Sequence, residues 1–284
     1  MATPFVTRFA PSPTGLLHRG HAFSALAAWQ AAQAAGGRFL LRIEDIDVTR
    51  SRPEYEAAIG EDLAWLGLAW ETPVRRQSEH LGDYAGALAR LAARGLVYRC
   101  FRTRRDVAET IAQAPHGAME AFRGAPLPAA EEARRVAAGE PFAWRLSLAA
   151  AEQALGGFED LTFLEEGEGP SGEHGLIQAR PALGGDVVLA RKDVGVAYHL
   201  AVVFDDALQG ITHVIRGRDL FEAAHVQRLL QALLDLPTPV YRHHRLLTGP
   251  DGRRYAKRDR AETLRELRAR GVSRVALSAE MGLG

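Results

Sequence analysis

The first 47 residues contain an apolar strand, a rigid turn, a helix and a second apolar strand, and this order constrains the fold most. Residues 6–10 are short and apolar, and the turn "PSPTG" at 11–15 has two prolines that fix φ and a glycine that permits positive φ. Residues 21–35 are rich in alanine with apolar side chains at helical spacing, and two glycines follow. The run "RFLLRIEDID" at 38–47 is typical of a buried parallel strand. Together they predict a βαβ unit and an α/β fold.

The composition bounds what the chain can be. Its 284 residues are 47% hydrophobic, enough for one large domain or for a core domain with an insertion. The 35 basic and 35 acidic residues cancel, so any polyanion has to be bound by a local basic surface. Cys100 is the only cysteine, which excludes an intrachain disulfide and a zinc site built mainly from thiolates. Without an N-terminal signal or a run of about 18 apolar residues, we expect a cytoplasmic protein with no membrane partner.

The composition and the pattern of apolar runs change twice along the rest of the chain. Apolar runs thin out from about residue 103 to residue 175, where proline, glycine, alanine and glutamate are frequent, and this indicates an inserted module with short elements of its own. Strand and helix alternation then returns. Beyond Pro237 a Gly-Pro-Asp-Gly turn precedes a basic helix.

The turn after the first strand is a candidate site. It lies at the carboxyl edge of a parallel sheet, where such sheets bind ligands, and a helix that begins just after His18 directs its N–H groups and its positive dipole end toward that edge. His18 and His21 can donate to phosphate oxygens, and Gly20 leaves room for a flat ring to stack on the backbone. The alternative is a proline-rich turn with two incidental histidines.

Longer motifs favour the functional interpretation. "RFAPSPTGLLHRGH" at 8–21, "LLRIEDID" at 40–47 and "AYHLAVVFDDALQGITHVIRGRDL" at 197–220 resemble the class I aminoacyl-tRNA synthetases in their glutamyl form, in the same order and over nearly the whole chain. The resemblance implies a Rossmann-type parallel-sheet catalytic domain with an inserted module. It also implies a short C-terminal helical region that contacts an RNA stem, and no anticodon-binding domain. The expected parts are the first half of the sheet at 1–102, an inserted acceptor or connective module at 103–180, the second half of the sheet at 181–240 and a C-terminal segment at 241–284.

A glutamate substrate carries one ammonium and two carboxylates, so its site needs a carboxylate and guanidinium groups. Glu44 at the end of the second strand can hold the ammonium, Arg8 and Arg216 can bind carboxylates, and Tyr198 can donate its hydroxyl. The alternatives are that Glu44 pairs with Arg42 or Arg50, that Arg216 pairs with Asp219 at the surface, and that Tyr198 only packs. The resemblance assigns the same positions to the glutamate site and adds four residues of the turn, namely Phe9, Ala10, Pro11 and Ser12.

The stretch "RRYAKR" stands where the family has its mobile K-M-S-K-S loop, and Lys257 is the one lysine of that motif that is kept. The chain has only two lysines, so a compact ammonium at this position is informative, although a solvated basic loop is the alternative. The resemblance implies that Lys257 acts with His18 and His21 on ATP, with Gly20 beside the nucleotide.

The sequence predicts no metal ion that is bound directly by protein side chains. Asp45 and Asp47 raise the possibility of a metal site, but Mg²⁺ is expected to be carried by the ATP phosphates, so no protein ligand is assigned. Some relatives bind zinc through a C-x-C pair, but here Arg102 stands where the second thiolate would be, and His116 is a lone loop histidine. We therefore predict that no zinc is bound.

The printed sequence ends soon after this loop, so we expect no separate anticodon reader. The resemblance is then strongest to a shortened branch of the family. Its members activate L-glutamate with ATP in the absence of tRNA and attach it to queuosine at the wobble position of tRNA(Asp). We expect a monomer. The alternatives are a stripped glutamyl-tRNA synthetase that charges a tRNA 3′ end, a small-molecule nucleotidyltransferase with the same H-x-G-H turn, and a non-catalytic tRNA-binding paralogue.

Overall fold

The computed structural model describes residues 4–112, 121–191, 195–248 and 262–283. The strands are β1 (Val6–Phe9), β2 (Arg38–Ile43), β3 (Glu71–Arg76), β4 (Val97–Cys100), β5 (Ala143–Leu146), β6 (Thr162–Glu165), β7 (Gly175–Gln178), β8 (Val188–Arg191), β9 (His213–Gly217) and β10 (Val240–His244). The helices are α1 (Arg19–Ala34), α2 (Pro53–Trp65), α3 (Leu81–Ala93), α4 (Arg104–Ala112), α5 (Ala129–Ala137), α6 (Leu148–Leu155), α7 (Tyr198–Leu208), α8 (Phe221–Leu233), α9 (Leu264–Ala269) and α10 (Arg274–Glu280).

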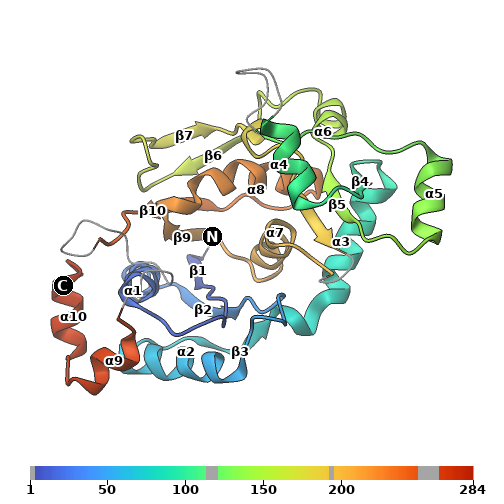
Figure 1. Cartoon of the computed structure of the whole chain (residues 1–284). Coiled ribbons are helices and arrows are strands. Elements are labelled where there is room, and N and C mark those ends of the chain that lie inside the picture. The colour runs from blue at the N-terminus through green and yellow to red at the C-terminus, as the bar shows by residue number, and fades with distance from the viewer. Residues whose placement is uncertain (1–3, 113–120, 192–194, 249–261, 284) are drawn as a thin grey trace.

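The predicted βαβ unit is confirmed. β1 pairs in parallel with β2, and β2 pairs in parallel with β3, with α1 as the crossover that covers β1 and β2 (Figure 1). α1 begins at Arg19, directly after His18 as expected, because the His18 side chain caps its first turn. The turn at 11–15 and the end of β2 are tied together, since the Glu44 N–H donates to the Pro11 carbonyl over 3.0 Å.

A second sheet has the order β7-β6-β10-β9, in which β9, β10 and β6 run parallel. Its edge lies beside β1, because the Val6 N–H donates to Thr212 Oγ1 over 2.8 Å and the Thr212 N–H donates to the Val6 carbonyl. β6 comes from the 103–180 stretch and still joins this sheet. Side chains from three separate parts of the chain are therefore placed on neighbouring strands.

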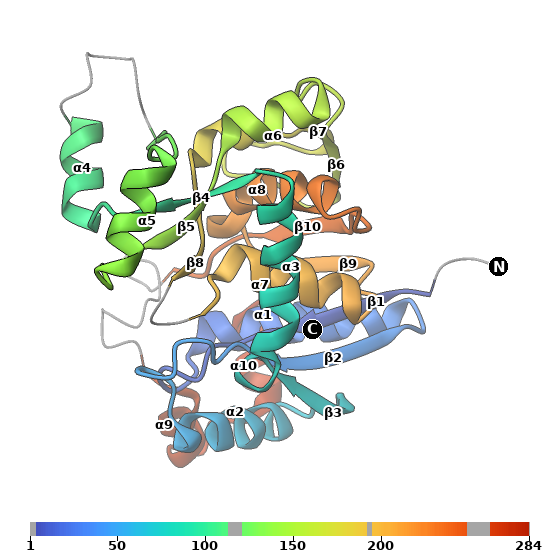
Figure 2. The same cartoon turned by 90° about the vertical axis from the view of Figure 1, so that its right-hand side faces the viewer.

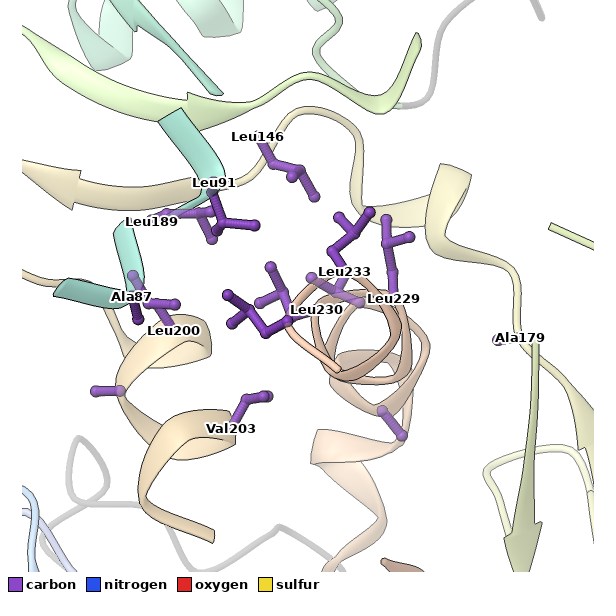
Figure 3. Packing of buried hydrophobic residues seen from close by; sticks show 14 of the residues in the cluster. Ala87, Leu91, Leu146, Ala179, Leu189, Leu200, Val203, Leu229, Leu230 and Leu233 are labelled. Carbon is purple, nitrogen blue, oxygen red and sulfur yellow. The ribbon is translucent and has the colours of Figure 1, made fainter. Parts of the chain in front are cut away.

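The larger core lies between α3, α7, α8 and the sheets around them. Leu229, Leu230 and Leu233 of α8 are fully buried, in the same cluster as Leu200 of α7 and Leu146 of β5 (Figure 3). Each fully buried leucine of this kind contributes about 1.5–3 kcal/mol relative to exposure. This packing fixes α7, whose polar residues hold the candidate site from behind.

Hydrogen bonds to one buried carboxylate, that of Asp186, connect β4 with the stretch that follows it. Asp186 is buried, and its carboxylate accepts hydrogen bonds from Tyr98 Oη and from the backbone N–H groups of Gly124 and Leu148, over 2.8–3.0 Å. α4 and α5 stand at the end of the molecule away from α9 and α10 (Figures 1 and 2). We infer that Asp186 orders the base of this module. The domain boundaries at 102, 180 and 240 stay a prediction.

The C-terminal segment is helical, as the resemblance implied, and contains two short helices, α9 and α10. Thr263 caps α9, and the Leu264 N–H donates to the Leu17 carbonyl over 2.8 Å, next to the His18 turn. Arg19 forms ion pairs with Glu262 and Glu280. The C-terminal segment therefore holds the start of α1 in place. Among the described helices, none has the length and apolarity that a membrane crossing needs.

Replacing Asp62 by asparagine is expected to stabilise the protein at neutral pH. Asp62 is fully buried on α2, neither carboxylate oxygen has a hydrogen-bond partner among the described residues, and Arg268 is 3.8 Å away. Burial raises the pKa of Asp62 to about 6, with partial compensation by Arg268 and Arg265. An acid whose folded pKa is raised destabilises the fold as pH rises from its unfolded pKa of about 4 toward 6.

We therefore expect Asp62→Asn to raise the free energy of unfolding by about 1–3 kcal/mol at pH 7.5, with the gain vanishing near pH 4. Urea denaturation at the two pH values measures it. Glu61→Gln, an exposed neighbour, is the control. An equal gain at both pH values would refute the titration argument.

Candidate active site

One hollow of about 590 Å³ brings together every predicted site residue that lies in the described part of the chain. It is lined by the end of β1 and its turn, the start of α1, the end of β2, the start of α7 and the end of β9. The predicted residues that line it are Arg8, Phe9, Ala10, Pro11, Ser12, His18, Gly20, His21, Glu44, Tyr198 and Arg216. Their individual roles stay predictions. Lys257 and His116 lie outside the described residues.

The two histidines hold the start of α1 and each other. His18 Nδ1 accepts from the Gly20 N–H over 3.1 Å, and His21 Nδ1 accepts from the His18 N–H over 3.2 Å. Their rings are 3.9 Å apart between centroids. Because Nδ1 is an acceptor in both rings, a neutral imidazole carries its proton on Nε2. The pair therefore offers Nε2–H donors at a helix N-terminus, an arrangement suited to phosphate.

Gly20 is needed for this close packing. A Cβ at this position would lie 3.0 Å from His18 Cε1. With a larger residue here, the His18 ring would have to shift by a few tenths of an ångström.

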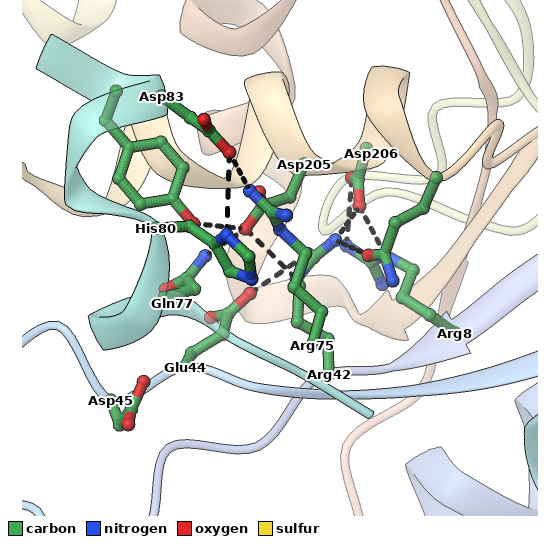
Figure 4. A network of polar contacts seen from close by, with 12 residues as sticks. Arg8, Arg42, Glu44, Asp45, Arg75, Gln77, His80, Asp83, Asp205 and Asp206 are labelled. Carbon is green, nitrogen blue, oxygen red and sulfur yellow. Dashed lines mark hydrogen bonds and ion pairs between the residues drawn. The ribbon is translucent and has the colours of Figure 1, made fainter. Parts of the chain in front are cut away.

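Arg8 and Glu44 are both held by a buried network behind the hollow (Figure 4). Arg8 pairs side-on with Asp206 through Nε and Nη2, at 2.9 and 3.2 Å. Arg42 is fully buried and donates to Asp206 over 2.7 Å and to Glu44 Oε1 over 3.0 Å. The alternative that Glu44 pairs with Arg42 is thus realised, but through only one carboxylate oxygen.

The environment of Glu44 suits a cationic ligand. Burial raises the pKa of Glu44, although Arg42 and Arg8 counteract this rise. A substrate ammonium beside the carboxylate would favour its charged form. Ligand binding would therefore relieve part of the cost of burying Glu44.

Arg216 is buried and has four partners, so it is not the surface residue that the alternative supposed. Its Nε donates to His243 Nε2 over 3.0 Å and its Nη2 donates to the Leu220 carbonyl over 3.0 Å. Its Nη1 donates to Gln227 Oε1 over 2.9 Å and, at a long 3.5 Å, to Tyr198 Oη. A guanidinium has five N–H groups, so one Nη2 N–H has no partner among the described residues and is left for a ligand. The Tyr198 contact is weak enough to exchange.

A second hollow, of about 830 Å³, adjoins the first, and the two share Ser12, Thr14, Glu44 and Tyr198 as lining residues. Its far wall carries Phe101 and Phe142, whose ring centroids are 5.6 Å apart. Five arginines also line this hollow, namely Arg50, Arg102, Arg104, Arg145 and Arg191. Aromatic faces among guanidinium groups suit the bases and phosphates of single-stranded nucleic acid.

No group of three or more potential metal-ligating residues occurs in the described ranges. Asp45 accepts hydrogen bonds from Ser78, and Asp47 accepts from Thr49 and Arg50, so both stabilise local structure. Cys100 is buried against Tyr98 and Phe122, which do not offer a tetrahedral zinc site. The absence of zinc stays a prediction.

Two residues that hold the site were missed by the sequence analysis, namely Asp206, which holds Arg8, and His243, which holds Arg216. Arg42, which holds Glu44, was named only as an alternative partner of that carboxylate. The paired carboxylates in "VFDDAL" were a usable signal, since two adjacent acids in an apolar helix imply buried partners. His243 in "YRHHRLL" carried no such signal.

Comparisons with known proteins agree with this geometry. Residues 4–283 match the family described as "tRNA synthetases class I (E and Q), catalytic domain". The chain is 48% identical to a glutamyl-Q tRNA(Asp) synthetase of Rhodobacter capsulatus, covering 98% of this chain and 100% of that protein. It is 42% identical to a protein of the same name from Symbiobacterium thermophilum, covering 94% of this chain and 82% of that protein.

Among solved structures, a glutamate-tRNA synthetase from Elizabethkingia anophelis superposes with a TM-score of 0.75 at 27% identity. The likeness covers 90% of this chain and 53% of that synthetase, so the chain spans about half of the larger protein's length. The predicted α/β fold with a parallel sheet is confirmed.

Proposed function

Since the chain belongs to the class I tRNA synthetases for glutamate and glutamine, and is a ligase, we propose that it activates L-glutamate with ATP and transfers the glutamyl group to queuosine in tRNA(Asp). The names of its relatives support this assignment, and so does the arrangement of the two adjoining hollows. Activation is proposed to need no tRNA. The protein is proposed to act as a monomer.

The first step takes place in the 590 Å³ hollow. Glu44 holds the substrate ammonium through the carboxylate oxygen that Arg42 leaves open, while Arg8 and Arg216 bind the two carboxylates. An α-carboxylate oxygen attacks the α-phosphorus of ATP, the bond to the bridging oxygen breaks, and pyrophosphate leaves. The Nε2–H groups of His18 and His21 stabilise the charge that builds on the phosphate oxygens.

Two other groups are proposed to assist this step. Lys257, outside the described residues, would bring an ammonium to the phosphates. Mg²⁺ would neutralise phosphate charge and is expected to be bound chiefly by ATP itself. The protein contributes positioning and electrostatic stabilisation rather than acid–base chemistry.

In the second step, a hydroxyl of the queuosine ring attacks the acyl carbon of glutamyl-adenylate, AMP leaves and the hydroxyl proton is released. The shared wall of the two hollows is the observation that carries this proposal. An acceptor nucleotide in the 830 Å³ hollow would approach the acyl group beside Glu44 and Tyr198, which line both hollows. Stacking of a base on Phe101 or Phe142 would contribute about 1–3 kcal/mol.

Charging assays with labelled glutamate test the proposal. We expect label on tRNA(Asp) that contains queuosine, none on the same tRNA without queuosine, and none on tRNA(Glu). Nuclease digestion should place the label in the anticodon fragment. Glutamate-dependent exchange of pyrophosphate with ATP should occur before any RNA is added, whereas aspartate should support none.

The alternatives give different results in the same assays. Label at the 3′ end of unmodified tRNA(Glu) would identify a stripped glutamyl-tRNA synthetase instead. Exchange that does not depend on glutamate would indicate a nucleotidyltransferase. RNA binding with no exchange under any condition would indicate a non-catalytic paralogue.

A further inference from the structure

Three buried residues form a hydrogen-bonded chain behind the wall of the smaller hollow. Glu165 Oε2 lies 2.5 Å from His243 Nδ1, and His243 Nε2 lies 3.0 Å from Arg216 Nε. The residues come from β6, β10 and β9, which are neighbours in one sheet, and His243 is directly opposite Arg216 in the register. Their exposed fractions are 0%, 1% and 5%, so water does not compete for these bonds.

The order of donors and acceptors leaves one state for His243. An arginine nitrogen only donates, so His243 Nε2 must accept and carries no proton. The proton of the neutral ring is therefore on Nδ1, where it points to the Glu165 carboxylate. An imidazolium, or the tautomer with its proton on Nε2, would place two N–H groups against each other.

The surroundings favour this state. Burial lowers the pKa of His243, and the nearby Arg216 lowers it further, against the opposing effect of Glu165. Burial opposes the charge of Glu165, but hydrogen bonds from the ring and backbone of His243 outweigh it and keep the pKa of Glu165 below its usual value. Glu165 is thus a carboxylate and His243 is neutral.

Glu165 is itself fixed from the other side. Its Oε1 accepts the backbone N–H groups of His243 and Gly167, each over 2.8 Å. Neither Glu165 nor His243 lines either hollow. Their effect on a ligand must therefore act through Arg216.

We propose that Glu165 and His243 are positioning residues that orient the Arg216 guanidinium toward a carboxylate of the amino-acid substrate. This inference rests on the proposed function, in which Arg216 binds glutamate. Holding Nε from behind turns the remaining Nη2 N–H and the exchangeable Nη1–Tyr198 contact toward the hollow. It also lets the 103–180 stretch, through β6, determine how well the substrate is bound.

Glu165→Gln tests the proposal with almost no change in shape. The amide oxygen satisfies the two backbone N–H groups, so the amide nitrogen faces His243 Nδ1 and forces the ring proton onto Nε2, against Arg216. The opposite amide orientation would set its N–H groups against the backbone donors. In the first orientation Arg216 loses its hydrogen-bond acceptor. In the second, the side chain at position 165 loses its hydrogen bonds to the two backbone N–H groups.

The expected result is a KM for glutamate raised by about tenfold or more in pyrophosphate exchange, with the KM for ATP unchanged, since a charge-assisted hydrogen bond is lost. Glu166→Gln is the matched control, because Glu166 is the next residue and pairs with Arg242 at the surface. A folded Glu165→Gln protein with a wild-type KM for glutamate would overturn the proposal, as would equal changes in both KM values.

A second measurement covers the case in which the variant does not fold. Nitrogen NMR of ¹⁵N-histidine protein, with His243 assigned by comparison with His243→Gln, reports the ring state in the wild type. We expect a neutral ring with its proton on Nδ1. A ring with its proton on Nε2, or an imidazolium at pH 7, would contradict the proposed hydrogen-bonded chain from Glu165 through His243 to Arg216. Wild-type protein without glutamate-dependent exchange would instead refute the proposed function.

Discussion

Replacing Arg42 by methionine is expected to lower the free energy of unfolding by about 3–5 kcal/mol, because it removes the buried cation that three carboxylates share and leaves Asp206 and Asp205 with one arginine each. Arg42 is fully buried and contacts Asp206 at 2.7 Å, Glu44 at 3.0 Å and Asp205 at 3.8 Å (Figure 4). Burial opposes its charge, yet these carboxylates raise its pKa above the usual value. Methionine fills much of the volume but supplies no charge.

Urea denaturation measures the effect, with Arg38→Met as the control. Arg38 lies on the same strand and pairs with Glu71, but half of its side chain is exposed, so we expect a change below about 1 kcal/mol. A similar loss of unfolding free energy in both variants would show that stability depends on positive charge on β2 in general rather than on the buried network of Arg42. Activity of a folded Arg42→Met protein should also fall, because Glu44 and Asp206 lose a shared partner.

Replacing His18 by asparagine is expected to slow glutamyl-adenylate formation by about 10²–10³-fold with little loss of stability. Asparagine is a good N-cap residue, so its side-chain oxygen can still accept the Gly20 N–H that His18 Nδ1 accepts. What the variant removes is the Nε2–H donor in the hollow. The effect should fall on kcat in pyrophosphate exchange, since the charge it stabilises grows in the transition state.

Circular dichroism and thermal melting check that α1 is retained. His174→Asn, on the loop between β6 and β7 and away from both hollows, is the matched control and should behave as the wild type. A fall of less than about threefold for His18→Asn would show that the ring serves only as a cap, and the assigned role in the transition state would be wrong.

Local features of the site were readable from the residues alone. The strand at 6–10, the proline turn and the glycine pair depend on φ preferences and on apolar spacing within about 15 residues, and all three lie where expected. The rule that ligands bind at the carboxyl edge of parallel strands then placed Arg8, His18 and Glu44 in one region. These residues line the same hollow.

The sequence did not show how the inserted stretch joins the rest of the fold. Composition separated residues 103–175 from the rest, but β6 pairs with β10 and belongs to the same sheet as Arg216. A four-residue strand has little sequence signal of its own, and its partner is about 80 residues away in the chain. Only the register of the sheet decides that Glu165 lies beside His243.

Local sequence specifies which chemical groups the chain offers and near which strand ends they lie. How these groups are held follows only from the folded arrangement. Asp206 meets Arg8 across 198 residues, and Glu165 meets His243 across 78. Such bonds form because burial removes water as a partner, and which buried groups then face each other is set by sheet register and helix packing, which no local pattern contains.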